Sequence, residues 1–469
     1  MRPLLHCGVW FARRLYPLAP LLFPFLLAAQ TDNFKDPIFS TVPFDQWVAQ
    51  GDHVDIPWRV KLSTPQLDDH QRFLVTVTIT VDGKHLSRSL PNGELLMLMQ
   101  IEDSQGRVYQ GHAVEQLGDM GKDLRRADIV YTHSALVIPG DYRFTLAMLH
   151  RGGADQSQGD YDLGHATLHV APLKNDPLPN AWEGTTPVEI IGKESDMEEW
   201  FHPDLTANLH LPLATRRPVR IELLVTLPRS RSAGEYYRQC MSALVAQMKV
   251  LSGIELSNGS IRITLLDAQH RGVVALSRHD RSLDWKELKP ALEKSNPNVI
   301  DVRHLGTHGE EAEFLAAEVR RRLQPDSGQD STNDERSAEP LPVLIFLSVP
   351  AGIGTEAGKP VALGELHDAS AYLVRYHPVV AIREMVDAAN ETSTAGSGIN
   401  SMSGNDVGLR QGLGRQTVPM PNAPRGGSDE KTITLQEVLR PLKPRIFDVD
   451  NPAQFREALA AILEEISRL

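Results

Sequence analysis

Apolar and polar residues alternate at period two in the first part of the chain. The clearest stretch is Phe73 to Val81, where every second residue is apolar and most of the others are threonine, with Asp82-Gly83 following directly. Such alternation predicts a half-buried strand, and Asp-Gly predicts a hairpin turn. Shorter apolar stretches follow at residues 95–101, 129–137, 142–149 and 166–170. Short strands at this spacing predict a β-sandwich over residues 43–172.

The pattern changes after a proline-rich stretch at residues 173–217, which we expect to be a linker that packs partly through Trp182. Apolar residues at helical spacing, such as Met241, Leu244 and Met248, then alternate with apolar runs. The run Val343 to Val349 is continuously apolar, as in a central strand covered on both faces. Alternating strands and helices predict a doubly wound, Rossmann-like α/β domain over residues 218–469. Two polar, low-complexity insertions, residues 324–339 and 392–431, should be disordered.

The first 29 residues have the composition of a signal peptide. Arg2, Arg13 and Arg14 precede an apolar run that closes on Ala28-Ala29. We therefore expect an exported protein, periplasmic or extracellular, with a retained membrane anchor as the alternative. No later segment has the length of a membrane span.

Charge and cysteine content narrow the class of partner. The chain has 60 acidic and 48 basic residues, a net charge of −12, which argues against binding to nucleic acid or anionic lipid. Only two cysteines are present, and loss of the signal peptide with Cys7 leaves Cys240 alone. The mature protein is then expected to have no internal disulfide.

The stretch Val219 to Ser232, VRIELLVTLPRSRS, is an apolar strand followed by a loop with Ser230 and Ser232. It resembles the first strand and loop of von Willebrand factor type A domains, in which Asp-x-Ser-x-Ser binds a divalent metal. The resemblance is nearest to the secreted von Willebrand A-related proteins of the acidobacterial type, which join an N-terminal β domain to such a module. It implies a von Willebrand A-type fold and adhesion-type binding. In the N-terminal part, residues 138–142 resemble the immunoglobulin-like turn in which a tyrosine hydroxyl, here that of Tyr142, caps a corner.

The same resemblance places three hydroxyl residues in the metal-site loops, Ser230, Ser232 and Thr307. Both family carboxylates are missing, because Pro228 and Val349 stand at their positions. Magnesium requires hard oxygens that usually include carboxylates. We therefore predict a degenerate site with no metal and no cofactor. Ser232 and Thr307 are also explained as helix N-caps, and Ser230 as an ordinary loop serine.

Other motifs do not meet the requirements of an enzyme. Gly354-x-x-x-Gly358-Lys359 has one residue too few for a phosphate-binding loop, and Pro360 follows the lysine. His304 and His308 have no glutamate between them, as a zinc protease motif requires.

The function predicted from the sequence is an exported, non-enzymatic protein-protein interaction module of the adhesion type. Its partner is an unknown protein ligand or envelope component. Two alternatives stay open: a structural scaffold in an envelope assembly, and a hydrolase with an unrecognised site.

Overall fold

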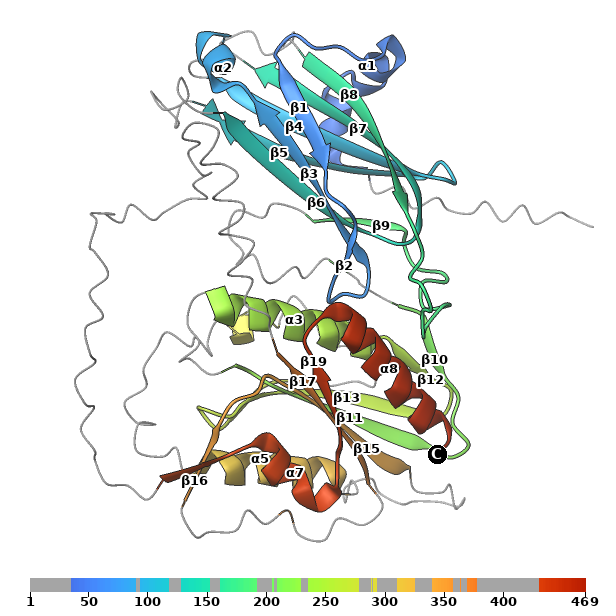
Figure 1. Ribbon diagram of the computed structural model, residues 1–469, viewed down its shortest axis with the longest axis vertical. Coiled ribbons are helices and arrows are strands. Elements are labelled where there is room, and N and C mark those ends of the chain that lie inside the picture. The colour runs from blue at the N-terminus through green and yellow to red at the C-terminus, as the bar shows by residue number, and fades with distance from the viewer. Residues whose placement is uncertain are drawn as a thin grey trace, which may run out of the picture.

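The computed structural model describes residues 35–89, 93–117, 128–151, 161–191, 205, 209–228, 235–277, 288, 290–292, 310–324, 340–356, 363, 369–377 and 430–469. Figure 1 shows two bodies, an N-terminal β part above and a C-terminal part with helices on both faces of a sheet below. The N-terminal part comprises residues 35–170 and strand β9 (Val188–Ile191). Residues 171–187, called here the connecting segment, lie between strands β8 and β9. The C-terminal part begins at residue 209.

Two antiparallel sheets form the N-terminal part. The first has the order β1-β3-β6-β9, with β2 pairing β3, and the second has the order β5-β4-β7-β8. The strands are β1 (Trp58–Leu62), β2 (Gln66–Leu67), β3 (Phe73–Val81), β4 (Glu94–Asp103), β5 (Val108–Gln116), β6 (Ile129–Val137), β7 (Gly140–Arg151) and β8 (Tyr161–Val170). Strands β3 and β6 have the bounds that the alternation predicts, because one face of each lies against the other sheet.

The two sheets pack face to face around one apolar core. Val75 and Val77 of the first sheet meet Met97 and Met99 of the second in this core. A second, smaller cluster covers the outer face of the four-stranded sheet. There the helices η1 (Pro37–Thr41) and α1 (Phe44–Gln50) bring in aromatic residues, and Trp47 stacks on Tyr161 with ring centroids 4.5 Å apart. The start of the described chain is thus part of the N-terminal fold.

Two local predictions for this part have opposite outcomes. The Tyr142 hydroxyl donates to the carbonyl of Ile138 at 2.7 Å, so the predicted corner contact is confirmed. The hairpin turn predicted at Asp82-Gly83 is wrong. The Asp82 carboxylate accepts the amide hydrogen of Lys84 at 2.8 Å, and helix α2 (Gly83–Ser89) begins there. Asp is favoured at helix N-termini as well as in turns, because its side chain can accept a backbone N–H of the first helical turn.

A six-stranded mixed sheet forms the centre of the C-terminal part, in the order β14-β13-β11-β15-β17-β19. Strand β14 is antiparallel to β13, and the other neighbours are parallel. Two short pairs, β10-β12 and β16-β18, stand outside this sheet. The strands are β10 (Leu211–Leu213), β11 (Val219–Thr226), β12 (Ile254–Leu256), β13 (Gly259–Asp267), β14 (Gly272–Leu276), β15 (Leu341–Ser348), β16 (Ile353–Glu356), β17 (Ser370–Tyr376), β18 (Glu430–Ile433) and β19 (Arg445–Val449).

Helices cover both faces of the six-stranded sheet (Figure 1). Helices α3 (Glu235–Ser252) and α8 (Pro452–Ser467) share one core with the sheet, and α5 (Glu311–Leu323) and α7 (Leu435–Leu439) share another. A 3-10 helix, η6 (Arg440–Leu442), follows α7. The helical face predicted from Met241, Leu244 and Met248 is confirmed by the burial of these residues in α3. The other two long helices each bury one apolar face in the same way: Ala312, Leu315, Val319 and Leu323 in α5; Phe455, Leu459, Ile462 and Ile466 in α8.

The predicted fold class is nevertheless wrong. We expected a doubly wound, Rossmann-like α/β domain of the von Willebrand A type joined to an immunoglobulin-like sandwich. The described chain is mostly β-strand, arranged in several sheets. The regular alternation fails between β15 and β17, where the described residues form strand β16 instead of a crossover helix. The antiparallel pair of β16 and β18 also departs from a parallel, doubly wound sheet.

Several predicted segments lie mainly outside the described residues. The predicted signal peptide, residues 1–29, is one of them. The insertions at 324–339 and 392–431 are described only at their ends, where Gln324 follows α5 and Glu430 begins β18. The predicted linker, residues 173–217, contributes β9 to the first sheet and β10 to a pair with β12. None of the described helices combines the length and the apolar character needed to cross a membrane.

Candidate functional site: a groove beside helix α8

The three hydroxyl residues predicted for the metal-site loops, Ser230, Ser232 and Thr307, lie outside the described residues. The two positions that lack the family carboxylates are described. Pro228 follows β11 and Val349 follows β15, at the same edge of the sheet because these strands pair in parallel. Both side chains are buried, and neither has an oxygen or nitrogen ligand atom. Within the described ranges, no three His, Cys, Asp or Glu side chains gather as a metal site would require.

Carboxylates at this edge of the sheet pair with basic side chains. Asp267, at the end of β13, contacts Nδ1 of His270 at 2.6 Å, and Glu310 forms an ion pair with Arg271. On the last strand of the sheet, β19, Asp448 accepts two hydrogen bonds of 2.7 Å from Arg375. These acidic groups are therefore engaged within the fold.

The N-terminal part reaches the C-terminal part through the turn between β2 and β3 (Figure 1). Gln71 in this turn has a positive φ of 59°, which a residue other than glycine seldom adopts. Its side-chain amide donates to the Pro452 carbonyl at 2.9 Å, at the start of α8. The neighbouring Asp69 accepts a hydrogen bond of 3.1 Å from Gln247 of α3. The turn thus contacts both helices on this face of the sheet.

Asp69 sits in an environment that disfavours its charge. Burial and the nearby Asp68 carboxylate raise the pKa of Asp69 to about 7, although Gln247 and His70 act in the opposite direction. Asp68 has the reverse shift. Burial alone would raise its pKa, but His70, with Nδ1 2.6 Å from the Asp68 carboxylate, lowers it below the ordinary value. One carboxyl of the turn is therefore charged at neutral pH, and the other titrates close to it.

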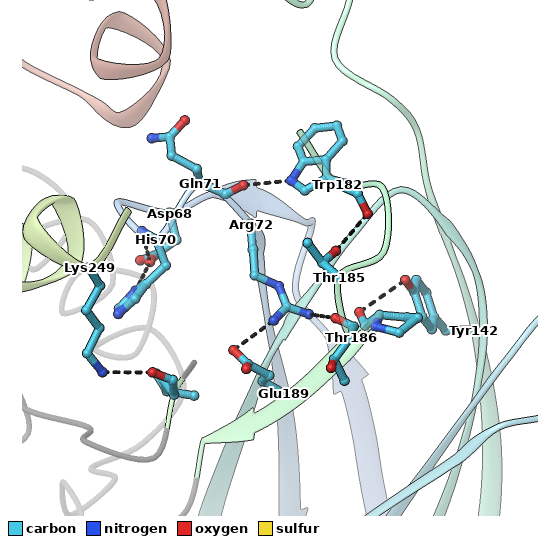
Figure 2. A network of polar contacts seen from close by, with 12 residues as sticks. Asp68, His70, Gln71, Arg72, Tyr142, Trp182, Thr185, Thr186, Glu189 and Lys249 are labelled. Atoms are coloured by element: carbon cyan, nitrogen blue, oxygen red, sulfur yellow. Dashed lines mark hydrogen bonds and ion pairs between the residues drawn. The ribbon is translucent and has the colours of Figure 1, made fainter. Parts of the chain in front are cut away.

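Figure 2 shows how the base of this turn is fixed. The Arg72 guanidinium pairs with Glu189 of β9 at 2.7 Å and donates to the carbonyl of Thr186. Both side chains of the pair are buried or nearly so, with 2% and 10% of their surface exposed. A buried guanidinium needs such partners, since an uncompensated charge is costly in the interior. The turn is thereby anchored to the strand that follows the connecting segment.

Trp182 of the connecting segment lies between the two parts. Its indole N–H donates to the Gln71 carbonyl at 2.9 Å, and its ring lies 5.9 Å from that of Phe73 in β3. On the other side, the Arg456 guanidinium of α8 stacks over the ring at 4.3 Å from the centroid. A cation over an aromatic face is an attractive contact, more so where water is excluded. The prediction that Trp182 packs against a domain is confirmed, and it packs against both parts.

Arg456 also holds the connecting segment directly. Its Nε and Nη2 donate to the two carboxylate oxygens of Asp176 at 2.6 and 2.8 Å, and Nη2 reaches the Leu178 carbonyl at 2.8 Å. The Arg456 side chain is 1% exposed and that of Asp176 is 8% exposed. Burial alone would raise the pKa of Asp176, but the hydrogen bonds from Arg456 and the Leu178 amide lower it below the ordinary value. The pair stays charged and fixes residues 176–178 against α8.

The open groove beside this clamp has a volume of about 710 Å³. Its floor is the outer side of α8, one wall is the connecting segment at residues 177–181, and the other wall is residues 210–214 with strand β10. The walls are joined by a hydrogen bond of 2.9 Å from the His210 amide to the Ala181 carbonyl. The Arg456–Asp176 pair therefore fixes one wall of the groove to its floor.

The chemistry of the groove is apolar and acidic. Ala460 and Ala461 lie in its floor between Glu457 and Glu464, and Pro177, Pro179 and Pro212 line its walls. No lysine or arginine is among the described residues that line it. Ser467 in its lining donates its hydroxyl to the Glu464 carbonyl at 2.7 Å. The apolar and acidic lining suits binding by shape and charge.

The sequence contains a signal for this groove that we did not use. Along α8, Glu457, Ala460, Ala461 and Glu464 follow the spacing of one helical face opposite the apolar stripe. Two alanines in the middle of an otherwise charged outer face leave a shallow, uncharged strip. The walls had no comparable signal, because prolines alone do not say where a segment lies.

Comparisons with known proteins add little to this geometry. No family model and no curated protein matches the chain. Among solved structures, Northeast Structural Genomics Consortium target SoR45 is 15% identical and aligns over 25% of this chain and 86% of its own, with a TM-score of 0.16. A glycosyl hydrolase family 2 member from Bacteroides cellulosilyticus DSM 14838 is 8% identical over 72% of this chain and 43% of its own, with a TM-score of 0.18. Similarities at these TM-scores identify neither a family nor an activity.

Proposed function

We propose that this protein is an exported, non-enzymatic interaction protein that binds a protein partner in the groove beside α8. The groove carries the proposal, because the buried Arg456–Asp176 pair holds one wall to the floor and the hydrogen bond from His210 to Ala181 joins the two walls before any ligand arrives. A surface that is already ordered loses less entropy on binding. Its apolar floor with few charged groups is typical of a recognition site.

Two further observations support this proposal. Pro228 and Val349 supply no ligand atom at the edge where adhesion domains bind a metal, so binding is proposed to be metal-independent. The amino-terminal sequence favours export, as argued from its basic, apolar and small-residue order. Binding at the loops of Ser230, Ser232 and Thr307 stays a prediction from the sequence.

The test is capture of partners from the envelope fraction of the native host, with the protein lacking residues 1–29 as bait. Ala460→Trp fills the floor of the groove without adding charge. Ala49→Trp makes the same change on the exposed side of α1, outside the groove, and serves as the matched control. Melting temperatures of all three proteins verify the folded state.

We expect one or more stoichiometric partners, identified by mass, with the wild type and with Ala49→Trp, and their loss with Ala460→Trp. Equal recovery by all three proteins would show that the groove is not the binding site. Turnover of a substrate that Ala460→Trp abolishes would instead favour an enzyme and contradict the proposal.

A further inference from the structure

The charged side chains in the floor of the groove beside α8 are carboxylates. Glu457 and Glu464 stand seven residues apart on one face of α8, which separates them by about 10 Å along the helix axis. Glu464 pairs with Arg468, the residue that follows the helix, and within the described part of the chain no basic side chain pairs with Glu457. His210, the basic residue of the wall, lies 3.5 Å from Glu255. The floor of the groove thus has two carboxylates, and of these Glu457 has no basic partner among the described residues.

The surface between the two carboxylates is low and apolar. Ala460 and Ala461 present only methyl groups there, and Pro177, Leu178 and Pro179 form the adjoining wall. A bound chain can approach the helix closely where side chains are this small. Apolar side chains of that chain would lose contact with water, which favours binding.

The walls favour side-chain contacts over strand addition. Proline has no backbone N–H, and Pro212 is the middle residue of the three-residue strand β10. Pro177 and Pro179 likewise cannot donate from the opposite wall. A regular ladder of main-chain hydrogen bonds needs alternating donors along an edge, and these walls interrupt it.

We infer that the groove takes a short, extended segment of a partner protein in which apolar residues alternate with lysine or arginine, the basic side chains pairing with Glu457 and Glu464. This inference rests on the proposed function and names the chemistry of the partner at the same site. Charge complementarity carries it: the groove is lined by carboxylates without lysine or arginine. The same charge excludes phosphate-bearing polymers, which need basic contacts.

Fluorescence anisotropy with three labelled octapeptides tests the inference at about 0.15 M salt, where distant charges are screened. The probes alternate leucine with lysine, with serine or with glutamate. We expect the lysine peptide to bind about tenfold more tightly than the serine peptide and the glutamate peptide not to bind. Equal binding of the lysine and serine peptides, or no binding of the lysine peptide, would overturn the inference.

Two charge-reversal variants distinguish attraction by the groove from attraction by the overall negative charge of the protein. Glu457→Lys should weaken binding of the lysine peptide by at least about tenfold, and Asp45→Lys, on the exposed surface of α1, by less than about twofold. Equal losses in both variants would mean nonspecific attraction and would overturn the inference.

The Ala460→Trp variant distinguishes failure of this inference from failure of the proposed function. One outcome is that Ala460→Trp abolishes binding of both the lysine and the serine peptide, while Glu457→Lys binds both as tightly as the wild type does. This result would support the groove as a protein-binding site and would refute its preference for basic side chains. Unchanged binding of the lysine peptide in Ala460→Trp would place that peptide elsewhere and refute the inference. The envelope-capture result decides the proposed function separately.

Discussion

Asp176 and Arg456 form a two-pronged, buried ion pair although 280 positions separate them in the sequence. Asp176 belongs to the connecting segment and Arg456 to the last helix, so this pair holds the connecting segment against α8. It fixes the wall of the groove to its floor, and the same guanidinium stacks on Trp182. One side chain therefore links the groove to the contact between the two parts.

Arg456→Ala should destabilise the protein by about 3–5 kcal/mol, because it leaves the Asp176 carboxylate buried without its counter-charge. Urea unfolding followed by circular dichroism measures the change. The matched control is Arg468→Ala directly after the same helix, which removes the exposed pair with Glu464 and should cost less than about 1 kcal/mol. Equal losses of unfolding free energy in the two variants would contradict this expectation. They would show that removing Arg456 does not leave the Asp176 carboxylate as a buried charge without a partner.

Trp182→Ala should loosen the contact between the N-terminal and C-terminal parts. The substitution removes the ring stacked under Arg456 and the N–H that satisfies the Gln71 carbonyl. Large aromatic-to-alanine changes in packed sites cost about 3–5 kcal/mol, and Trp182 is partly exposed, so we expect the lower end. Scanning calorimetry should show one transition for the wild type and two for the variant. A single, unshifted transition in Trp182→Ala would contradict a structural role for this contact.

Asp69 should make stability fall as the pH rises from about 4 to about 7. Its pKa is raised from 3.8 to about 7 in the folded protein, first by burial and then by Asp68. In this window the folded state holds a proton that the unfolded state has released, so unfolding releases protons and becomes easier at higher pH. Above about pH 7 the effect is complete.

Unfolding free energies of the wild type and Asp69→Asn across this range measure that contribution. The amide cannot ionise, so Asp69→Asn should have a flatter profile between pH 4 and 7, with the difference growing toward pH 7. Asp68 does not produce the same effect, because its pKa is lowered and its contribution is lost only as the pH falls through its folded pKa. Parallel curves of unfolding free energy against pH for the wild type and Asp69→Asn would show that the pKa of Asp69 is not raised in the folded protein.

Local hydrophobic patterns predicted those strands and helices that pack against the core with one face only. Phe73 to Val81 alternates because one face of β3 meets the other sheet, and the residues Phe455, Leu459 and Ile462 repeat because one side of α8 meets the C-terminal sheet. Helix α3 is different. From Cys240 to Leu251 every side chain except Ser242 is buried, since the sheet lies on one side and the β2–β3 turn contacts the other. The apolar residues Ala243, Val245 and Val250 on its second face were an unused signal of this double cover.

The fold class and the groove depended on information that no local pattern contains. An apolar run is compatible with a strand in a parallel or an antiparallel neighbourhood, so the residues near Ile353 did not disclose the antiparallel pair of β16 with β18. The groove requires Asp176 to meet Arg456, and a charged residue in a proline-rich stretch does not specify a partner far away in the chain.

Magnesium and manganese should leave the melting temperature unchanged. Pro228 and Val349 are the positions at which the resemblance in the sequence implied missing carboxylates, and both are buried side chains without ligand atoms. A ligand that binds only the folded state stabilises it by about 2.7 kcal/mol at a hundred times its dissociation constant, so millimolar metal is a sensitive probe. The double variant Pro228→Asp with Val349→Asp restores the family's set of oxygens and should gain weak, magnesium-dependent stabilisation.

Calorimetry that finds tight magnesium binding in the wild type would contradict the degenerate site. The first candidates would then be Asp267 and Glu310, tested by Asp267→Asn and Glu310→Gln, with the loss of their contacts to His270 and Arg271 measured separately by unfolding without metal.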